Sequence, residues 1–218
     1  MRSFRTLAAG LALTALLPAV GAAQEGRLFK DAWFWGVNTG VMTFWTTRVS
    51  HAPAPMIGVE WLITRSRVGL YLSAENAWFD RQTSVDDYPD MTTTREVHIE
   101  NMHRASASLL AFPKSFGILR PYAGIGFALN VIQTATPVGP VTQTDADGNT
   151  VKDYIADRAT RTAPLILGGV QAQYSRFSVF GQASVMNSAN RFLLNNNPTV
   201  FVQGGIRYNV GSAIERDR

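Results

Sequence analysis

The chain has 218 residues, no cysteine and a formal net charge of +4 at pH 7. Without cysteine there can be no disulfide framework and no thiolate metal site, and so small a charge, spread along the chain, excludes the clustered basic face that nucleic-acid binding needs. The mean hydropathy of -0.01 is far below that of a helical membrane protein. It suits strands with one apolar and one polar face, and the length predicts a single domain.

Residues 1–23 are predicted to be an export signal. A basic start with Arg2 and Arg5 precedes an apolar stretch of 14 residues from Leu7 to Val20, and small residues at 21 and 23 fit cleavage after Ala23. That stretch is too short to span a bilayer as a helix. The mature chain, residues 24–218, has 18 basic and 16 acidic residues once Arg2 and Arg5 are removed, a net charge of +2. Because it has no long apolar run, it could cross a membrane only as a closed barrel.

Eight segments of alternating polarity follow the signal. In the clearest, Ile57, Val59 and Trp61 alternate with Gly58 and Glu60, so large residues share one face and small or polar residues the other. This pattern is typical of strands with lipid outside and a polar interior. The predicted strands cover residues 33–45, 57–64, 67–79, 96–112, 121–131, 162–174, 176–186 and 199–210.

The segment 96–112 has two predicted faces. The outward set is Val97, Ile99, Ala105, Ala107, Leu109 and Ala111, and the inward set is His98, Glu100, Met102, Arg104, Ser106 and Ser108. Asn101 and His103 interrupt the apolar face.

The connections alternate in length. Short ones at 64–67, 113–120 and 175–176 alternate with longer ones at 46–55, 80–95, 135–161 and 187–198. Transmembrane barrels have short periplasmic turns and long extracellular loops, and an even strand count leaves both termini periplasmic. The predicted fold is therefore all-β, an eight-stranded antiparallel up-and-down transmembrane β-barrel that forms one domain over residues 24–218.

Aromatic residues are predicted to form two belts at the membrane interfaces, where amphipathic rings are favoured. Those expected near the periplasmic strand ends are Trp35, Trp61, Tyr122, Tyr174, Phe177 and Tyr208, and those expected near the outer ends are Trp45 and Trp78.

Two stretches carry a family resemblance, RPYAGIGFALNV at 120–131 and QGGIRYNV at 203–210. Through them the mature chain resembles the small eight-stranded outer-membrane barrels, such as the transmembrane domain of outer membrane protein A. Gln203, Gly205, Tyr208 and Val210 match the strand pattern that the assembly machinery of this class reads, although Val210 stands where a terminal aromatic is usual. The resemblance implies a monomer in outer-membrane lipid, delivered by periplasmic chaperones and inserted by the barrel assembly machinery.

Five charged residues have inward phase: Glu60, Glu75, Glu100, Arg104 and Arg207. An eight-stranded interior is just wide enough for side chains to fill it, and buried charges must pair. We expect the arginines to bridge the glutamates. A static plug is favoured over a gate that switches partners, because buried ion networks are commonly structural.

Metal, cofactor and enzyme chemistry are not expected. His98 and Glu100 with Glu75 would give only three ligands, and Asp145 to Asn149 starts like a calcium loop but has Ala156 at its twelfth position in place of glutamate. Some outer-membrane barrels are lipid A deacylases with a histidine and a serine near the end of the seventh strand, and the nearest stretch here, 185–191, has Ser188 and Asn190 but no histidine. His51 lies in the first loop, and Ser106 or Ser108 with His98 would be buried in the lumen.

Three functions stay open. The first is a structural or surface-interaction role. The second is a narrow channel or transporter for small solutes or apolar compounds, for which the glycines on the inner faces of 33–45 and 121–131 would leave room. The third is a soluble lipocalin-like barrel, which is disfavoured because the polar residues share the phase of the glycines.

Overall fold

The computed structural model describes residues 29–49, 51–86, 94–139, 141, 150–187, 192–194 and 198–212. The predicted signal peptide lies outside these residues. The strands are β1 (Ala32–Phe44), β2 (Ala52–Arg65), β3 (Val68–Asp86), β4 (Thr94–Ala111), β5 (Leu119–Pro137), β6 (Thr160–Tyr174), β7 (Phe177–Met186) and β8 (Thr199–Ser212), with helix α2 at Val151–Ala159.

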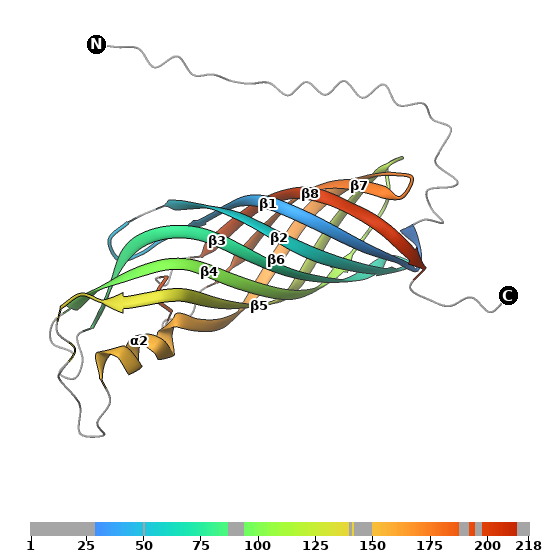
Figure 1. Ribbon diagram of the computed structural model, residues 1–218. Helices are drawn as coiled ribbons and strands as arrows, with labels where there is room; N and C mark the ends of the chain where they lie inside the picture. Colours follow the sequence, from blue (N-terminus) through green and yellow to red (C-terminus); the bar gives the residue numbers. More distant parts are fainter. Residues whose placement is uncertain are drawn as a thin grey trace, which may run out of the picture.

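The strands form one closed barrel. Each strand pairs with the next, and β1 pairs antiparallel with β8 to close the sheet. The short turns after β2, β4 and β6 lie at the end where β1 starts and β8 finishes, and α2 lies at the other end (Figure 1). We call these the turn end and the loop end. The predicted eight-stranded up-and-down barrel is confirmed.

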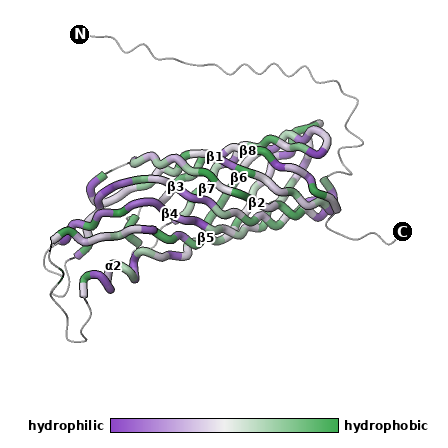
Figure 2. Tube along the Cα trace, viewed as in Figure 1, coloured by the Kyte–Doolittle hydropathy of each residue, from purple (hydrophilic) through white to green (hydrophobic). Residues whose placement is uncertain are grey.

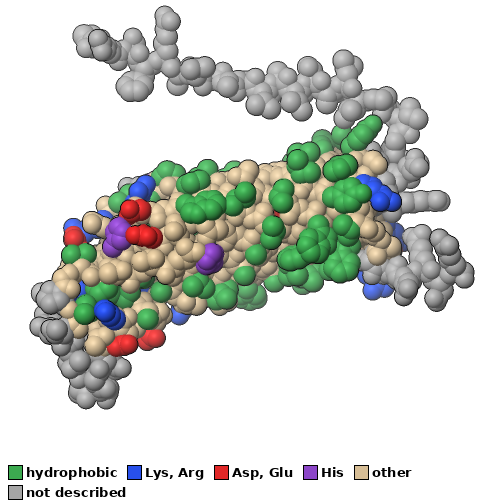
Figure 3. Space-filling model, in the orientation of Figure 1, with side chains coloured by type: hydrophobic (Ala, Val, Ile, Leu, Met, Phe, Trp, Pro, Cys, Tyr) green, Lys and Arg blue, Asp and Glu red, His purple; other side chains and the backbone are tan. Residues whose placement is uncertain are grey.

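Exposure alternates along each strand as the barrel requires. In β7, Phe177, Val179 and Val185 are exposed, whereas Ser178 and Gln182 are buried in the lumen. Hydrophobic side chains form patches along the visible outer wall, and charged side chains gather at its two ends (Figure 3). The hydropathy of the trace likewise alternates along the wall and becomes hydrophilic around α2 (Figure 2).

Three strands continue beyond the rim at the loop end. β3 and β4 pair as far as Asp86 and Thr94, and β4 pairs with β5 as far as Val97 and Pro137. The predicted loops 80–95 and 135–161 are therefore partly strand. The edge of β3 is covered by loop side chains, since the Thr46 hydroxyl donates to the Gln82 carbonyl (2.9 Å) and Ser84 N–H donates to Thr47 Oγ1 (2.6 Å).

Helix α2 was not predicted from the sequence. A capping box starts it, formed by Thr150 and Asp153. Pairing between β5 and β6 ends at Val131 and Thr160, so α2 continues the line of β6 alongside the upper part of β5. At nine residues, this helix is too short to cross a membrane, and the described part of the chain has no helix that is long and apolar enough to do so.

The predicted faces of residues 96–100 were wrong. Asn101 adopts a left-handed conformation (φ 53°), and the register between β3 and β4 shifts between Ala77 and Asp80. Trp78 and Phe79 of β3 therefore face the single residue Asn101 of β4, and beyond this β-bulge the phase of burial along β4 is reversed. Val97 and Ile99 are consequently buried in the interior, and His98 and Glu100 lie on the outer surface.

The interior has apolar layers at both ends. At the turn end, Phe29 packs edge-on against Phe112, with ring centroids 4.8 Å apart. At the loop end, Phe44 and Phe79 lie 4.8 Å apart, and Ile155 of α2 belongs to the same buried cluster. Between these layers lie polar and charged side chains.

Candidate functional site

The first buried ion pair joins β2 to β8. Arg207 Nε lies 2.5 Å from Glu60 Oε1, and neither side chain is exposed. The other carboxylate oxygen accepts from the Tyr71 hydroxyl (2.8 Å) and from Asn38 Nδ2 (3.4 Å). Arg207 Nη1 donates to Gln171 Oε1 (2.7 Å). The pair is thus held by partners on β1, β3 and β6.

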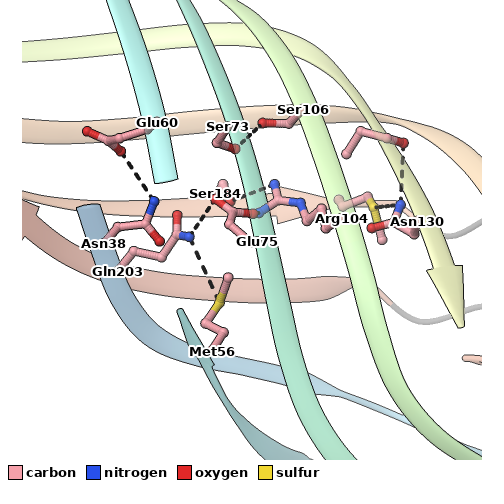
Figure 4. Close-up of polar contacts among 12 residues, drawn as sticks. Asn38, Met56, Glu60, Ser73, Glu75, Arg104, Ser106, Asn130, Ser184 and Gln203 are labelled. Atoms are coloured by element: carbon pink, nitrogen blue, oxygen red, sulfur yellow. Dashed lines mark hydrogen bonds and ion pairs between the residues drawn. The ribbon is translucent and has the colours of Figure 1, made fainter. Parts of the chain in front are cut away.

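The second buried ion pair joins β3 to β4. Arg104 Nη1 lies 2.8 Å from Glu75 Oε2, and the two side chains are 3% and 1% exposed. Glu75 Oε1 also accepts from Gln203 Nε2 of β8 (2.8 Å), and Arg104 Nη2 donates to Ser184 Oγ of β7 (3.5 Å). Figure 4 shows these side chains pointing toward one another between the strands.

Gln182 of β7 links the two pairs. Its amide donates to the Tyr71 hydroxyl (3.0 Å) and to Gln203 Oε1 (2.9 Å), and its carbonyl oxygen accepts from the Tyr122 hydroxyl (3.0 Å). Because Tyr71 also binds Glu60 and Gln203 also binds Glu75, one continuous chain of contacts connects both ion pairs. We call it the lumen network. It consists of Glu60, Tyr71, Glu75, Arg104, Gln182, Ser184, Gln203 and Arg207.

Rings and glycines fill the space around the network. The Arg207 guanidinium lies 3.8 Å from the Phe180 ring centroid, and that of Arg104 lies 3.9 Å from the Phe201 centroid. A Cβ added at Gly36 would come within 2.9 Å of Glu60 Oε1. The prediction that inner-face glycines leave room for a channel is therefore wrong at Gly36, since the space beside it is already occupied.

Glu100 does not belong to the lumen network, contrary to the prediction. On the outer surface, His98 Nε2 lies 2.9 Å from Glu100 Oε1 and 3.3 Å from Asp80 Oδ1. Glu75 is buried inside the barrel, so the ligand set His98, Glu100 and Glu75 cannot assemble. For the same reason His98 cannot serve Ser106 or Ser108, which face the lumen.

The predicted aromatic belt at the turn end is a cross-strand row. Its members are register partners from β6 to β2, namely Tyr174, Phe177, Tyr208, Trp35 and Trp61. Rings along it touch, with centroids 4.5 Å apart for Trp35 and Trp61 and 5.0 Å apart for Phe177 and Tyr208.

The remaining belt residues lie in three different settings. Tyr122 was wrongly placed in the belt, because it points into the lumen and is 4% exposed. Trp78 is exposed on β3, and Trp45 follows β1, with its ring 4.7 Å from that of His51.

The strand motif in β8 divides between the two faces. Gln203 belongs to the lumen network, and Gly205 faces Phe180 from the inside. Tyr208 and Val210 are exposed on the outer wall. Ser188, Asn190 and the predicted turn at 145–149 lie outside the described residues.

The part that Tyr71, Gln182 and Ser184 take in the network was not predicted from the sequence. Tyr71, Gln182 and Ser184 have the inward phase of their strands, which was recognisable from the alternation. No pattern in the sequence indicates which inward residues touch, because partners such as Tyr71 and Gln182 are 111 positions apart.

A closed eight-stranded barrel with a polar interior and an apolar outer wall is the fold of the small outer-membrane barrels. The solved structure of Neisserial surface protein A shares this fold with a TM-score of 0.54 and 10% identity, over 81% of this chain and 96% of that one. Ail, the attachment invasion locus protein of Yersinia pestis, solved with the heparin analogue sucrose octasulfate, gives a TM-score of 0.47 and 8% identity, over 83% and 99%. No protein-family model and no curated protein matches the sequence.

Proposed function

We propose that the protein is an integral barrel of a bacterial outer membrane, exported by a signal peptide at residues 1–23. The exposed apolar wall and the aromatic row at the turn end support this, because lipid tails favour the first and the membrane interface favours the second. The fold shared with Neisserial surface protein A supports the same location. The turn end would face the periplasm and the loop end the outside.

The role supported best is structural or surface-interactive, with a closed lumen. The observation that carries this proposal is the lumen network, which crosses the interior from β3 to β7 and ties both ion pairs together. Apolar layers cover it at each end. A side-chain plug of this kind stabilises the barrel and leaves the loop end to meet partners.

Biogenesis would follow the general route of such barrels. Periplasmic chaperones would deliver the chain, and the barrel assembly machinery would read the last strand, where Tyr208 and Val210 are exposed on the outer wall. We expect a monomer, because closing the sheet leaves no unpaired strand edge within the barrel.

Gel mobility of the protein from isolated outer membranes, boiled against unboiled, tests the location. A closed barrel resists detergent and migrates faster until it is boiled. A soluble periplasmic protein without this shift would contradict the proposal and favour the soluble ligand-binding barrel.

Conductance in planar bilayers then tests the closed lumen. We expect no steady steps from the wild-type protein. Steps in the wild-type protein would contradict the plug and favour the narrow channel or transporter. A matched variant with Tyr71, Gln182 and Arg104 replaced by serine, and with Phe29 and Phe44 of the apolar layers replaced by alanine, removes side chains that cross the lumen and thins both layers. It should conduct if these side chains are the barrier.

A further inference from the structure

An apolar hollow lies on the outer wall over β3 to β6. Its volume is about 430 Å³, within the range of small-ligand pockets. Ala107 is among the residues that line it, and the taller side chains around it project outward, with Leu109, Ile125 and Ile166 each 67% exposed. The taller lining residues are Leu70, Leu109, Ile125, Phe127, Pro164 and Ile166.

Small residues continue from the hollow toward the loop end. Ala105 follows Ala107 on the outward face of β4, and its register partner on β3 is Ala74, which is also exposed. The outward side chains along this line are therefore small, and larger outward side chains of β3 and β5 stand on either side of it. We call the hollow and this line together the outer groove.

Polar side chains end the outer groove. Gln133 Nε2 donates to Asn76 Oδ1 (3.4 Å) and contacts His103 Nε2, and His103 and Gln133 are exposed. These residues stand on the face that otherwise carries apolar side chains. Polar groups toward lipid are unfavourable unless they hydrogen-bond. The contacts among these side chains use Nε2 of Gln133 and Oδ1 of Asn76, so each amide still offers its other polar atom to a ligand at this end of the groove.

The length of the groove corresponds to one leaflet. From Leu109 to His103 is six residues along β4, about 20 Å at about 3.4 Å per residue. With a strand tilt of about 40° this spans about 15 Å of depth, half of a hydrocarbon core about 30 Å thick. The polar end lies toward the loop end, which the proposed function places outside.

We infer that the outer groove binds one acyl chain of a bilayer phospholipid, with His103, Asn76 and Gln133 hydrogen-bonding where the chain joins its headgroup. This rests on the proposed membrane location. Asp80 and Glu100 carry carboxylates beyond the polar end, on the same outer surface. The group that meets His103 and Gln133 is accordingly an ester, amide or hydroxyl and not a phosphate.

Retention of a diacyl phosphatidylethanolamine by the detergent-purified barrel, measured by native mass spectrometry, tests the inference. Ala107→Trp fills the groove and should weaken retention at least about tenfold. Ala183→Trp is the matched control, because Ala183 is exposed on the wall of β7, away from the groove. Gln133→Leu leaves the hollow intact and should weaken retention by a smaller factor, which provides a second readout if Ala107→Trp fails to fold.

Equal retention by the wild type and all three variants would overturn the inference and leave only a general lipid annulus. A dimer without bound lipid that Ala107→Trp abolishes would also overturn it, because a second copy would then occupy the groove. Insertion into phosphatidylcholine vesicles, read by gel mobility, tests the membrane location separately from the binding of lipid in the outer groove. If the wild type fails to insert, the membrane location falls and this inference falls with it. If it inserts and retention is unselective, only the groove assignment falls.

Discussion

Two ion pairs of nearly equal length lie in opposite surroundings. Glu75 and Arg104 are 2.8 Å apart inside the barrel, where their side chains are 1% and 3% exposed. Arg48 and Glu96 are 2.7 Å apart at the loop end, where their side chains are 51% and 41% exposed. The distance between the charges is the same, so any difference in what the two pairs do must come from burial.

Burial changes the consequence of losing a partner. An exposed pair contributes about 0–1 kcal/mol, because water solvates whatever charge is left. A buried pair contributes little net stability, yet removing one partner costs about 3–5 kcal/mol since the other charge stays unpaired. Losing one partner is therefore expected to be costly in the lumen pairs and nearly neutral in the rim pair.

The largest effect is expected from Glu60→Ala. Arg207 would remain fully buried without its carboxylate, and Tyr71 would lose its acceptor, so we expect a loss of about 3–5 kcal/mol in the free energy of unfolding. Urea unfolding in lipid vesicles, followed by tryptophan fluorescence, measures it. The double variant Glu60→Ala with Arg207→Met removes both charges and should recover much of the loss. If the double variant recovers no stability, the loss in Glu60→Ala does not come from leaving the charge of Arg207 unpaired.

A double-mutant cycle on Glu75 and Arg104 sharpens the comparison. We expect a coupling energy of about 1–3 kcal/mol, because the two side chains are buried, bond to each other and are register partners on the neighbouring strands β3 and β4. The single changes Glu75→Gln and Arg104→Met and their combination complete the cycle by urea unfolding. A coupling energy below that of an exposed pair would refute the role assigned to burial.

The faces of the strands were predictable because lipid and lumen impose a period of two. Glu60, Glu75, Arg104 and Arg207 could thus be assigned inward from their neighbours alone. Glu100 could not, because the assignment depends on the bulge at which two residues of β3 face Asn101 alone, and beyond it the phase of β4 is reversed. A β-bulge shows in a polarity pattern only as a break in the alternation. Asn101 and His103, which are polar at positions where apolar residues were expected, formed that break.

Other features depend on contacts between distant residues. Tyr122 lies near the start of β5, as belt residues do, but its hydroxyl donates a hydrogen bond to Gln182, which is 60 positions away in the sequence. Helix α2 forms where β6 could have continued, and its burial of Val151 and Ile155 requires the neighbouring extension of β5. Neither can be derived from local polarity.

The rim pair offers the smaller counterpart to the buried cycle. For Arg48→Ala, Glu96→Ala and the double variant we expect a coupling energy of about 0–1 kcal/mol. The coupling should shrink further in high salt, because exposed charges are screened. The same vesicle unfolding assay, run at low and high sodium chloride, measures it. A salt-independent coupling as large as that of Glu75 and Arg104 would remove the contrast between the two regions.

The smallest effect is expected from protonation of Asp153 in the N-terminal cap of α2 at the loop end. Thr150 N–H and the Thr150 hydroxyl both donate to Asp153 Oδ2 (2.8 Å each), and these bonds hold the pKa of Asp153 below its usual value. A carboxyl with a lowered pKa in the folded state contributes stability above its unfolded pKa, and this contribution is lost as the pH falls through the folded pKa. The protection of the α2 amides in nanodiscs, taken as the exchange rate relative to that of an unfolded peptide at the same pH, should therefore fall on acidification, while the gel mobility of the barrel is unchanged. Asp153→Asn keeps an acceptor without a titrating group, so the protection of α2 in this variant should no longer depend on pH. If the dependence persists in that variant, Asp153 is not the group that acid acts on.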